Sequence, residues 1–194
     1  MVFTDGTVYR GKFLNNRRHG HGHYRTENGT PIYTGPWKND EPGTGYADIL
    51  YPSGHRYKGN VCDGCRDGRG SLWHQDPDGD STFLYRGQWE ADEMHGEGEL
   101  HCSDGVYRGQ FVHGLREGKG RFEYAKSTET LSYYEGEWEE DQPHGAGTFV
   151  DEHGQEYAVR FSAYWAPQSS TTVITACVHG RCRWLRTESS STET

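Results

Sequence analysis

The sequence predicts an all-β protein, built as an elongated single-layer meander of tandem β-hairpins. Three observations lead to this fold class. A short motif recurs along most of the chain, and the residues within it alternate with the two-residue period of a β-strand. In addition, most of the large side chains are aromatic rings rather than aliphatic groups.

The composition suits a core in which aromatic rings lie over glycines. Leu, Ile, Val and Phe together make up only 27 of the 194 residues, a share that in most chains would indicate disorder. However, the chain contains 13 Tyr and 6 Trp, and its 27 Gly are about twice the usual share. We therefore expect a folded protein whose rings pack against backbone.

The recurring motif is Tyr-x-Gly-x-aromatic, followed by Gly-x-Gly. The first part occurs at Tyr9–Phe13, Tyr33–Trp37, Tyr85–Trp89, Tyr107–Phe111 and Tyr134–Trp138, and a weaker copy, Tyr57–Val61, lacks the second ring. The second part begins at Gly20, Gly43, Gly68, Gly96, Gly118 and Gly145. These copies give six clear units, and a degenerate seventh at Tyr157–Phe161 has Val159 in place of Gly.

Each unit is predicted to be one hairpin. The Tyr, the Gly and the second ring share one face of a first strand, and a polar turn such as Asn15–Arg18 separates this strand from an alternating Gly-x-Gly strand. Glycine weakens a strand, so glycine at alternate positions indicates room for a ring of a neighbouring strand. Six such hairpins would span about 55 to 60 Å.

The repeat pattern also suggests domain boundaries. We expect the repeat array to cover residues 1–161, a C-terminal cap that reads as a β-hairpin to cover residues 162–186, and a disordered tail to cover residues 187–194.

The compound motif resembles the membrane occupation and recognition nexus (MORN) repeat. The segments that carry the resemblance are YRGQWEADEMHGEGELHCSDGVYRGQF, from Tyr85, and YEGEWEEDQPHGAGTFVDEHGQEY, from Tyr134. The sequence departs from the family pattern at Val61, where a ring is expected, and at Asp67 and Glu117, where His is usual. The resemblance implies a scaffold in a cytoskeletal, ciliary or flagellar, or cortical assembly.

Catalysis is not expected. The chain has no nucleophile in a strained elbow and no carboxylate pair that stands out from its general acidity, and the Gly-x-Gly pairs lie between strands rather than opening helices. We therefore expect a non-enzymatic interaction scaffold, and self-association through its ends stays open. The alternative is a module that binds anionic phospholipid.

The distribution of charge favours a protein partner over nucleic acid or lipid. Residues 1–75 carry a net charge of +3, residues 76–157 carry −14, and residues 158–194 carry +2. Nucleic-acid binding needs a broad basic surface, which this pattern excludes. Lipid binding would have to rely on the few basic residues Arg10, Lys12, Arg17, Arg18 and Arg25 beside an acidic body. A basic or helical protein segment is the expected partner.

Two sets of residues are candidates for partner binding. A single-layer ribbon cannot bury both of its faces, so some rings are expected to line a partly open groove for a peptide: Tyr33, Trp37, Trp89, Tyr107, Phe111 and Trp138. The alternative is that these rings serve packing alone. The acidic sixth unit adds Glu135, Glu137 and Glu139 as a docking patch, with a merely solvated strand as the alternative.

Metal binding has two weak candidates, and no cofactor is expected. Cys62 and Cys65 form a C-x-x-C without nearby partners, and His19, His21 and His23 alternate along one strand. A fortuitous cysteine pair and solvated histidines are the favoured readings. The sequence has no secretory signal and no run of about 20 apolar residues, so we expect a cytoplasmic protein with reduced thiols, associated with cytoskeleton, cilium or membrane.

Overall fold

The computed structural model describes residues 1–76, 80–125, 133–162, 173–178 and 181–186. Every element in these ranges is a β-strand, and no helix suited to crossing a membrane occurs among them. The chain divides into two compact units, Met1–His101 and Cys102–Thr194, here called unit 1 and unit 2. Both consist of antiparallel strands in meander order, which confirms the predicted fold class.

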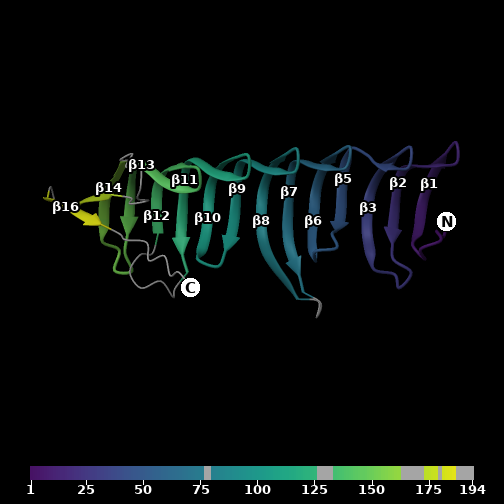
Figure 1. Ribbon diagram of the computed structural model, residues 1–194, viewed down its shortest axis with the longest axis horizontal. Coiled ribbons are helices and arrows are strands. Elements are labelled where there is room, and N and C mark those ends of the chain that lie inside the picture. The colour runs from purple at the N-terminus through teal and green to yellow at the C-terminus, as the bar shows by residue number, and fades with distance from the viewer. Residues whose placement is uncertain (77–79, 126–132, 163–172, 179–180, 187–194) are drawn as a thin grey trace, which may run out of the picture. The chain divides into compact units, whose positions relative to one another are not determined.

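Unit 1 contains four hairpins (Figure 1). Its strands are β1 (Val8–Leu14), β2 (Arg17–Arg25), β3 (Pro31–Lys38), β4 (Glu41–Pro42), β5 (Gly45–Leu50), β6 (His55–Cys62), β7 (Cys65–Gln75), β8 (Ser81–Glu90) and β9 (Glu93–Cys102). They pair in chain order, except that the short β4 pairs only with β3. We number the hairpins 1 to 4, as β1/β2, β3/β4–β5, β6/β7 and β8/β9.

Unit 2 continues the same pattern. Its strands are β10 (Gly105–Val112), β11 (Leu115–Tyr124), β12 (Tyr133–Glu139), β13 (Gln142–Val150), β14 (Glu156–Ser162), β15 (Val173–Val178) and β16 (Arg181–Arg186). Hairpins 5 and 6 are β10/β11 and β12/β13. Strand β15 pairs with β14 and β16, in the region of the expected cap, whereas the expected tail at 187–194 lies outside the described residues. The domain boundaries stay predictions.

The six hairpins share one turn geometry. Each turn has two central residues with positive φ, which is the type I′ turn that matches the twist of antiparallel strands. The central pairs are Asn15/Asn16, Asn39/Asp40, Asp63/Gly64, Ala91/Asp92, His113/Gly114 and Glu140/Asp141. Asn, Asp and Gly tolerate this conformation best, which explains the polar segments between the two halves of each motif.

Tyrosine rings lie over a row of facing glycines. In hairpin 3, Gly59 faces Gly70, and a Cβ on Gly70 would collide with the ring of Tyr57. The Tyr57 hydroxyl then donates a hydrogen bond of 2.7 Å to the carbonyl oxygen of Asn60. The motif tyrosine of each of the other five hairpins makes the same bond to the residue three positions later: Tyr9, Tyr33, Tyr85, Tyr107 and Tyr134. The alternate glycines therefore leave the space in which the tyrosine rings of the core pack against the backbone.

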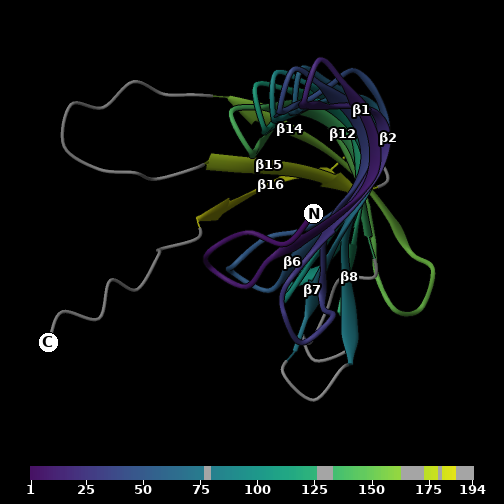
Figure 2. The ribbon, with the colours of Figure 1, turned by 90° about the vertical axis from the view of Figure 1, so that its right-hand side faces the viewer.

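Within unit 1 the hairpins repeat with the same curvature, so that successive strands nearly superimpose in Figure 2. The glycine row Gly11, Gly22, Gly35 passes from hairpin 1 to hairpin 2 without a break. At the second strand of hairpin 2 the row continues with Ala47, which faces Gly59 and is fully buried. Hairpins 2 and 3, the least regular in sequence, therefore keep the architecture of the others.

Candidate functional site

The six aromatic rings predicted to form a binding groove are buried. Their exposed fractions are 5% or less: Tyr33 5%, Trp37 5%, Trp89 5%, Tyr107 0%, Phe111 1% and Trp138 4%. They contact neighbouring rings edge to face, as Tyr85 and Trp89 do at a centroid distance of 5.0 Å. The expectation of a partly open groove lined by these rings therefore needs correction, because each ring is covered by strands and neighbouring rings. A role of these rings in partner binding stays untested.

Burial also affects the tyrosine hydroxyls. Removal from water raises the pKa of Tyr33 to about 12, and the same cause, with a smaller contribution from nearby Glu137, raises the pKa of Tyr134 to about 12. Both hydroxyls are neutral hydrogen-bond donors at physiological pH. Their chemistry is structural.

A set of arginines, not recognised from the sequence, joins the hairpins in pairs. In each case a guanidinium lies over a tryptophan of the next hairpin and is bonded to an aspartate in that hairpin's turn. The three sets are the first clamp (Arg18, Trp37, Asp40), the second clamp (Arg66, Trp89, Asp92) and the third clamp (Arg116, Trp138, Asp141).

The second clamp shows the geometry. The Arg66 Cζ atom lies 4.1 Å from the centre of the Trp89 ring, and its Nε is 3.0 Å from Asp92 Oδ1. The backbone NH of Arg66 donates to the same carboxylate at 2.8 Å, and the backbone NH of Asp92 donates to the Arg66 carbonyl oxygen at 2.9 Å. Partial burial of Asp92 would raise its pKa, but these hydrogen bonds outweigh it and hold the pKa of Asp92 below its ordinary value.

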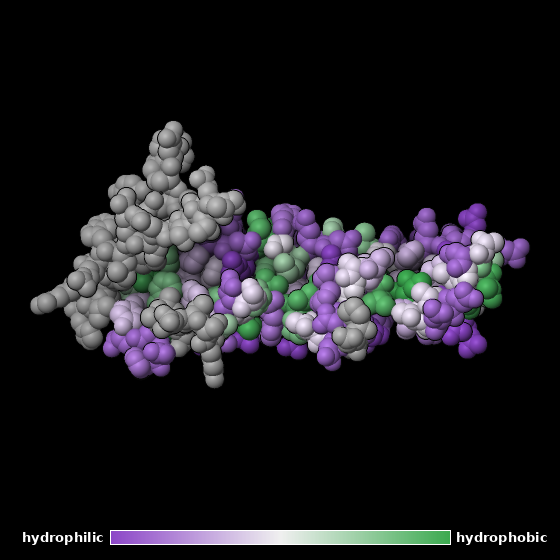
Figure 3. Space-filling view, turned by 60° about the horizontal axis from the view of Figure 1, so that its bottom comes forward, coloured by the Kyte–Doolittle hydropathy of each residue, from purple (hydrophilic) through white to green (hydrophobic). Residues whose placement is uncertain are grey.

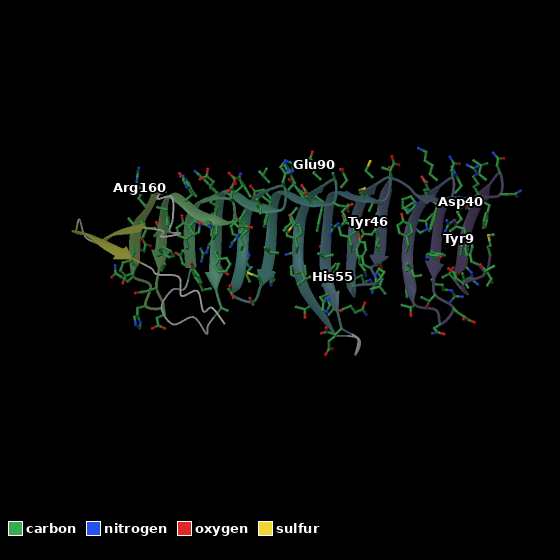
Figure 4. All side chains as sticks on the ribbon, in the orientation of Figure 1. Tyr9, Asp40, Tyr46, His55, Glu90 and Arg160 are labelled. Atoms are coloured by element: carbon green, nitrogen blue, oxygen red, sulfur yellow. The ribbon has the colours of Figure 1, made fainter. Side chains whose placement is uncertain are left out.

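The first clamp engages one of the basic residues of unit 1 that the sequence offered for lipid binding. Arg18, counted in the sequence as a candidate contact for lipid, is bonded to Asp40 and lies 4.2 Å from the Trp37 ring centre. Figure 4 shows Asp40 at the edge of unit 1 where the hairpin turns lie, with His55 toward the opposite edge. Arg10, Lys12, Arg17 and Arg25 are exposed, so the basic surface is smaller than the sequence suggests.

The acidic residues of hairpin 6 lie beside basic residues of hairpin 5. Glu135 faces Arg121 across β11 and β12, with 3.7 Å between carboxylate and guanidinium, and Glu137 faces Lys119. Glu139 lies near the turn, where its carboxylate is 2.9 Å from His144 Nδ1. The predicted acidic patch is thus one half of a surface that carries both signs of charge.

These residues line a shallow depression of about 780 Å³ in unit 2. We call it the charged face; its side chains are Arg108, Lys119, Arg121, Tyr133, Glu135, Glu137, Thr148 and Glu156. The guanidinium of Arg121 lies 3.7 Å from the centre of the Tyr133 ring, which holds it in place. The charged side chains of this lining suit a polar polypeptide segment better than an apolar ligand. In the part of the described chain that Figure 3 leaves uncovered, hydrophobic side chains are interspersed with hydrophilic ones.

The two sets of metal-site candidates lie in hairpins 3 and 1. Cys62 and Cys65 are exposed free thiols that face each other across the turn of hairpin 3. His21 and His23 lie with ring centres 5.4 Å apart, and His23 contacts the hydroxyl of Thr34. Within the described ranges, no group of three or more His, Cys, Asp and Glu side chains has the arrangement of a metal site.

Comparison with known proteins identifies the repeats. The family model for the MORN repeat matches residues 9–30, 85–106, 107–129 and 134–152. These four segments are MORN repeats. Hairpins 2 and 3 lie outside the matched segments but have the same turn type, and hairpin 3 also has the strand register of hairpins 1 and 5. MORN repeats are associated with interaction with proteins or membranes, and the repeat is a non-enzymatic module.

Curated relatives extend the match beyond single repeats. Alsin from Rattus norvegicus is 31% identical over 119 residues, which are 59% of this chain and 7% of alsin. Human alsin is 30% identical over the same length. The human ALS2 C-terminal-like protein is 34% identical over 92 residues, 47% of this chain and 10% of that relative. The matched region is thus a small part of each relative.

Proposed function

We propose that this protein is a non-enzymatic scaffold that binds a protein segment on the charged face of unit 2. The observation that supports this most is the depression itself, in which Arg121 and Lys119 on β11 stand beside Glu135 and Glu137 on β12. A shallow depression with paired charges of both signs selects a partner by charge complementarity. The buried rings support this face from the other side of the sheet.

The kind of partner is inferred from the charged side chains of this face that are least neutralised by neighbouring side chains. The side chain of Glu135 is 62% exposed and its distance of 3.7 Å to Arg121 is long for an ion pair, so much of its charge faces solvent. A segment with Lys or Arg opposite Glu135 and Glu137, and an acidic residue opposite Lys119 or Arg121, would fit. We place such a complex in a cytoskeletal, ciliary or cortical assembly on the family resemblance alone.

The test is affinity purification with charge-reversed variants. Glu135→Lys with Glu137→Lys should lose a protein that the parent recovers, because two attractive contacts become repulsive. The matched control is Asp104→Lys with Glu152→Lys, which makes the same change in net charge at two exposed positions of unit 2 that do not line the depression. Circular dichroism of all three proteins confirms that the fold is kept. Equal recovery by the parent and by the Glu135/Glu137 variant would contradict the proposal.

Anionic lipid is the second candidate. Arg10 and Lys12 are exposed and alternate on the same side of β1, which is the observation in its favour. Each basic residue near an anionic surface contributes about 1 kcal/mol, so two to four of them bind weakly. Sedimentation with phosphatidylserine vesicles, with and without a phosphoinositide, should leave the protein in the supernatant. Salt-sensitive sedimentation that disappears in Arg10→Ala with Lys12→Ala would favour lipid instead.

A further inference from the structure

The turn of hairpin 3 places two cysteines directly opposite each other on neighbouring strands. Cys62 and Cys65 flank the central residues Asp63 and Gly64, whose φ values are 45° and 88°. In a two-residue type I′ hairpin the flanking residues are a hydrogen-bonded pair, with Cα atoms about 5.5 Å apart. This separation falls within the range of about 4.4 to 6.8 Å found for disulfides. The backbone separation therefore suits a disulfide once the two side chains rotate toward each other.

Both thiols are also accessible. Cys62 and Cys65 are exposed and unbonded to other cysteines, so a small oxidant reaches either sulfur directly. The third described cysteine, Cys102, is exposed as well, but its thiol lies 3.3 Å from the Gly105 carbonyl oxygen and no cysteine faces it in the described strands. The chain therefore contains an internal comparison between a paired thiol and a single one.

Each thiol of the pair contacts a different neighbouring hairpin. The Thr44 hydroxyl, next to β5 of hairpin 2, donates to the Cys62 sulfur at 3.8 Å. The Cys65 thiol is hydrogen-bonded to the carboxylate of Asp92, the aspartate of the second clamp in hairpin 4. This hydrogen bond raises the pKa of the Cys65 thiol, which favours its protonated form. The cysteine pair therefore contacts hairpin 2 on one side of hairpin 3 and hairpin 4 on the other.

We propose that Cys62 and Cys65 form a reversible intramolecular disulfide when the protein meets a small-molecule disulfide such as oxidised glutathione. The thiolate of one cysteine attacks the oxidant, forms a mixed disulfide and releases one glutathione thiolate. The second cysteine, after losing its proton, attacks the protein sulfur of the mixed disulfide and releases the other glutathione. The protein loses two electrons and two protons, and one oxidised glutathione becomes two reduced molecules.

Formation of the disulfide changes the second clamp. The oxidised Cys65 has no S–H, so it can no longer donate a hydrogen bond to Asp92, which keeps its bonds to Arg66. The turn of hairpin 3 becomes covalently closed at the same time. Oxidation therefore alters how hairpins 3 and 4 are joined without removing any strand from the sheet.

The experiment uses the full chain with Cys102, Cys177 and Cys182 changed to Ser, so that only the pair remains. After incubation with oxidised glutathione, trypsin releases residues 59–66 as one peptide that contains both cysteines. The expected peptide is lighter than the reduced one by two hydrogen atoms and carries no glutathione. A peptide bearing one or two stable glutathione adducts, or disulfide-linked dimers of the protein, would overturn the proposal.

Variants with a single cysteine of the pair provide the control, and Cys102 provides a reference for the sensitivity to oxidised glutathione. Cys62→Ser and Cys65→Ser, in the same background, should stop at one glutathione adduct. In the unsubstituted chain, which keeps Cys102, half oxidation of the Cys62/Cys65 pair should need on the order of tenfold less oxidised glutathione than half modification of Cys102, because the second step of the pair is intramolecular. Equal sensitivity of the pair and of Cys102 would show that the two thiols react independently.

Discussion

Odd and even hairpins look alike in their strands but differ in what they contribute to the joints between them. Hairpins 1, 3 and 5 supply an arginine two residues before Gly-x-Gly, whereas hairpins 2, 4 and 6 supply the tryptophan and the turn aspartate that receive it. At the tryptophan position the odd hairpins have Phe13, Val61 and Phe111. The structural module of this array is therefore a pair of hairpins, with a period of two repeats.

This difference between odd and even hairpins predicts which joints between hairpins are the most stable. Within unit 1, hairpins 1 and 2 are joined by the first clamp, and hairpins 3 and 4 by the second. Hairpins 2 and 3 are joined at their turns by Thr44, whose hydroxyl is 3.2 Å from Asp63 Oδ1. This exposed contact between one hydroxyl and one carboxylate is expected to be weaker than a clamp, in which a guanidinium makes several hydrogen bonds to an aspartate and also lies over an indole ring.

The largest expected effect comes from removing an even-hairpin ring. Trp89→Ala should lower the free energy of unfolding by about 3 to 5 kcal/mol, because the indole is buried, donates a hydrogen bond to the Gly70 carbonyl oxygen and packs against the Arg66 guanidinium. The matched change in an odd hairpin, Val61→Ala, should cost about 1.5 kcal/mol, the value of two buried methylene groups. Urea unfolding measures both. Equal losses would mean that the two classes of hairpin carry equal weight.

A smaller effect is expected from the clamp charges. Arg66→Ala and Asp92→Ala should each destabilise the protein, with a coupling energy of about 1 to 2 kcal/mol in the double-mutant cycle, since the bonded groups are only partly exposed. Arg69 is the control on the same strand, because it is exposed, and Arg69→Ala should change stability by less than about 0.5 kcal/mol. A coupling energy near zero would reduce the clamp to a surface ion pair.

The second clamp should also make stability depend on pH. The pKa of Asp92 is lowered in the folded protein, so the stability that it contributes is fully present above the ordinary carboxyl pKa of about 3.9. This contribution is lost as the pH falls through the lowered value. Asp92→Asn should flatten this part of the stability profile below about pH 4, whereas the exposed control Asp67→Asn should leave the profile of the parent in place. Tryptophan fluorescence in urea at several pH values measures the difference.

The smallest effect is expected where a clamp residue is added without its partners. Pro42 faces Trp37 at the position that Arg66 occupies in hairpin 3. Pro42→Arg should not stabilise the joint between hairpins 2 and 3, because hairpin 3 offers Val61 and Gly64 where hairpin 4 offers Trp89 and Asp92. A gain of more than about 0.5 kcal/mol in the urea midpoint analysis would show that arginine alone makes a joint.

The sequence predicted the hairpins well because their causes are local. Alternation, turn residues and facing glycines all act within about 20 residues, so the strands, the polar turns and the packing of rings over glycines could be anticipated. The exposure of the rings could not, since it depends on neighbouring strands that cover Trp89 and Trp138 from the side. A single sheet does leave one face open, but the six rings predicted to lie on that face are buried.

The clamps were missed for a different reason. Arg66 lies on β7 and Asp92, 26 positions later, lies in the turn of hairpin 4, so no motif within one repeat contains both. Arg18 was counted with the basic residues for the same reason. The signal was nevertheless present, as alternation of Trp with Phe or Val from one repeat to the next, together with Arg in odd units and Asp in even turns. A search for a period of two repeats would have found it.

The pairing of hairpins is tested most directly by native-state hydrogen exchange of unit 1 in the parent and in Arg66→Ala. If hairpins 3 and 4 act as one module, the amides of β8 and β9 should exchange faster in the variant by a factor on the order of ten, for a loss of about 1.4 kcal/mol, while those of β1 to β3 keep their protection. An equal increase in exchange across all strands of unit 1 would contradict the two-hairpin module and make the whole unit the cooperative element.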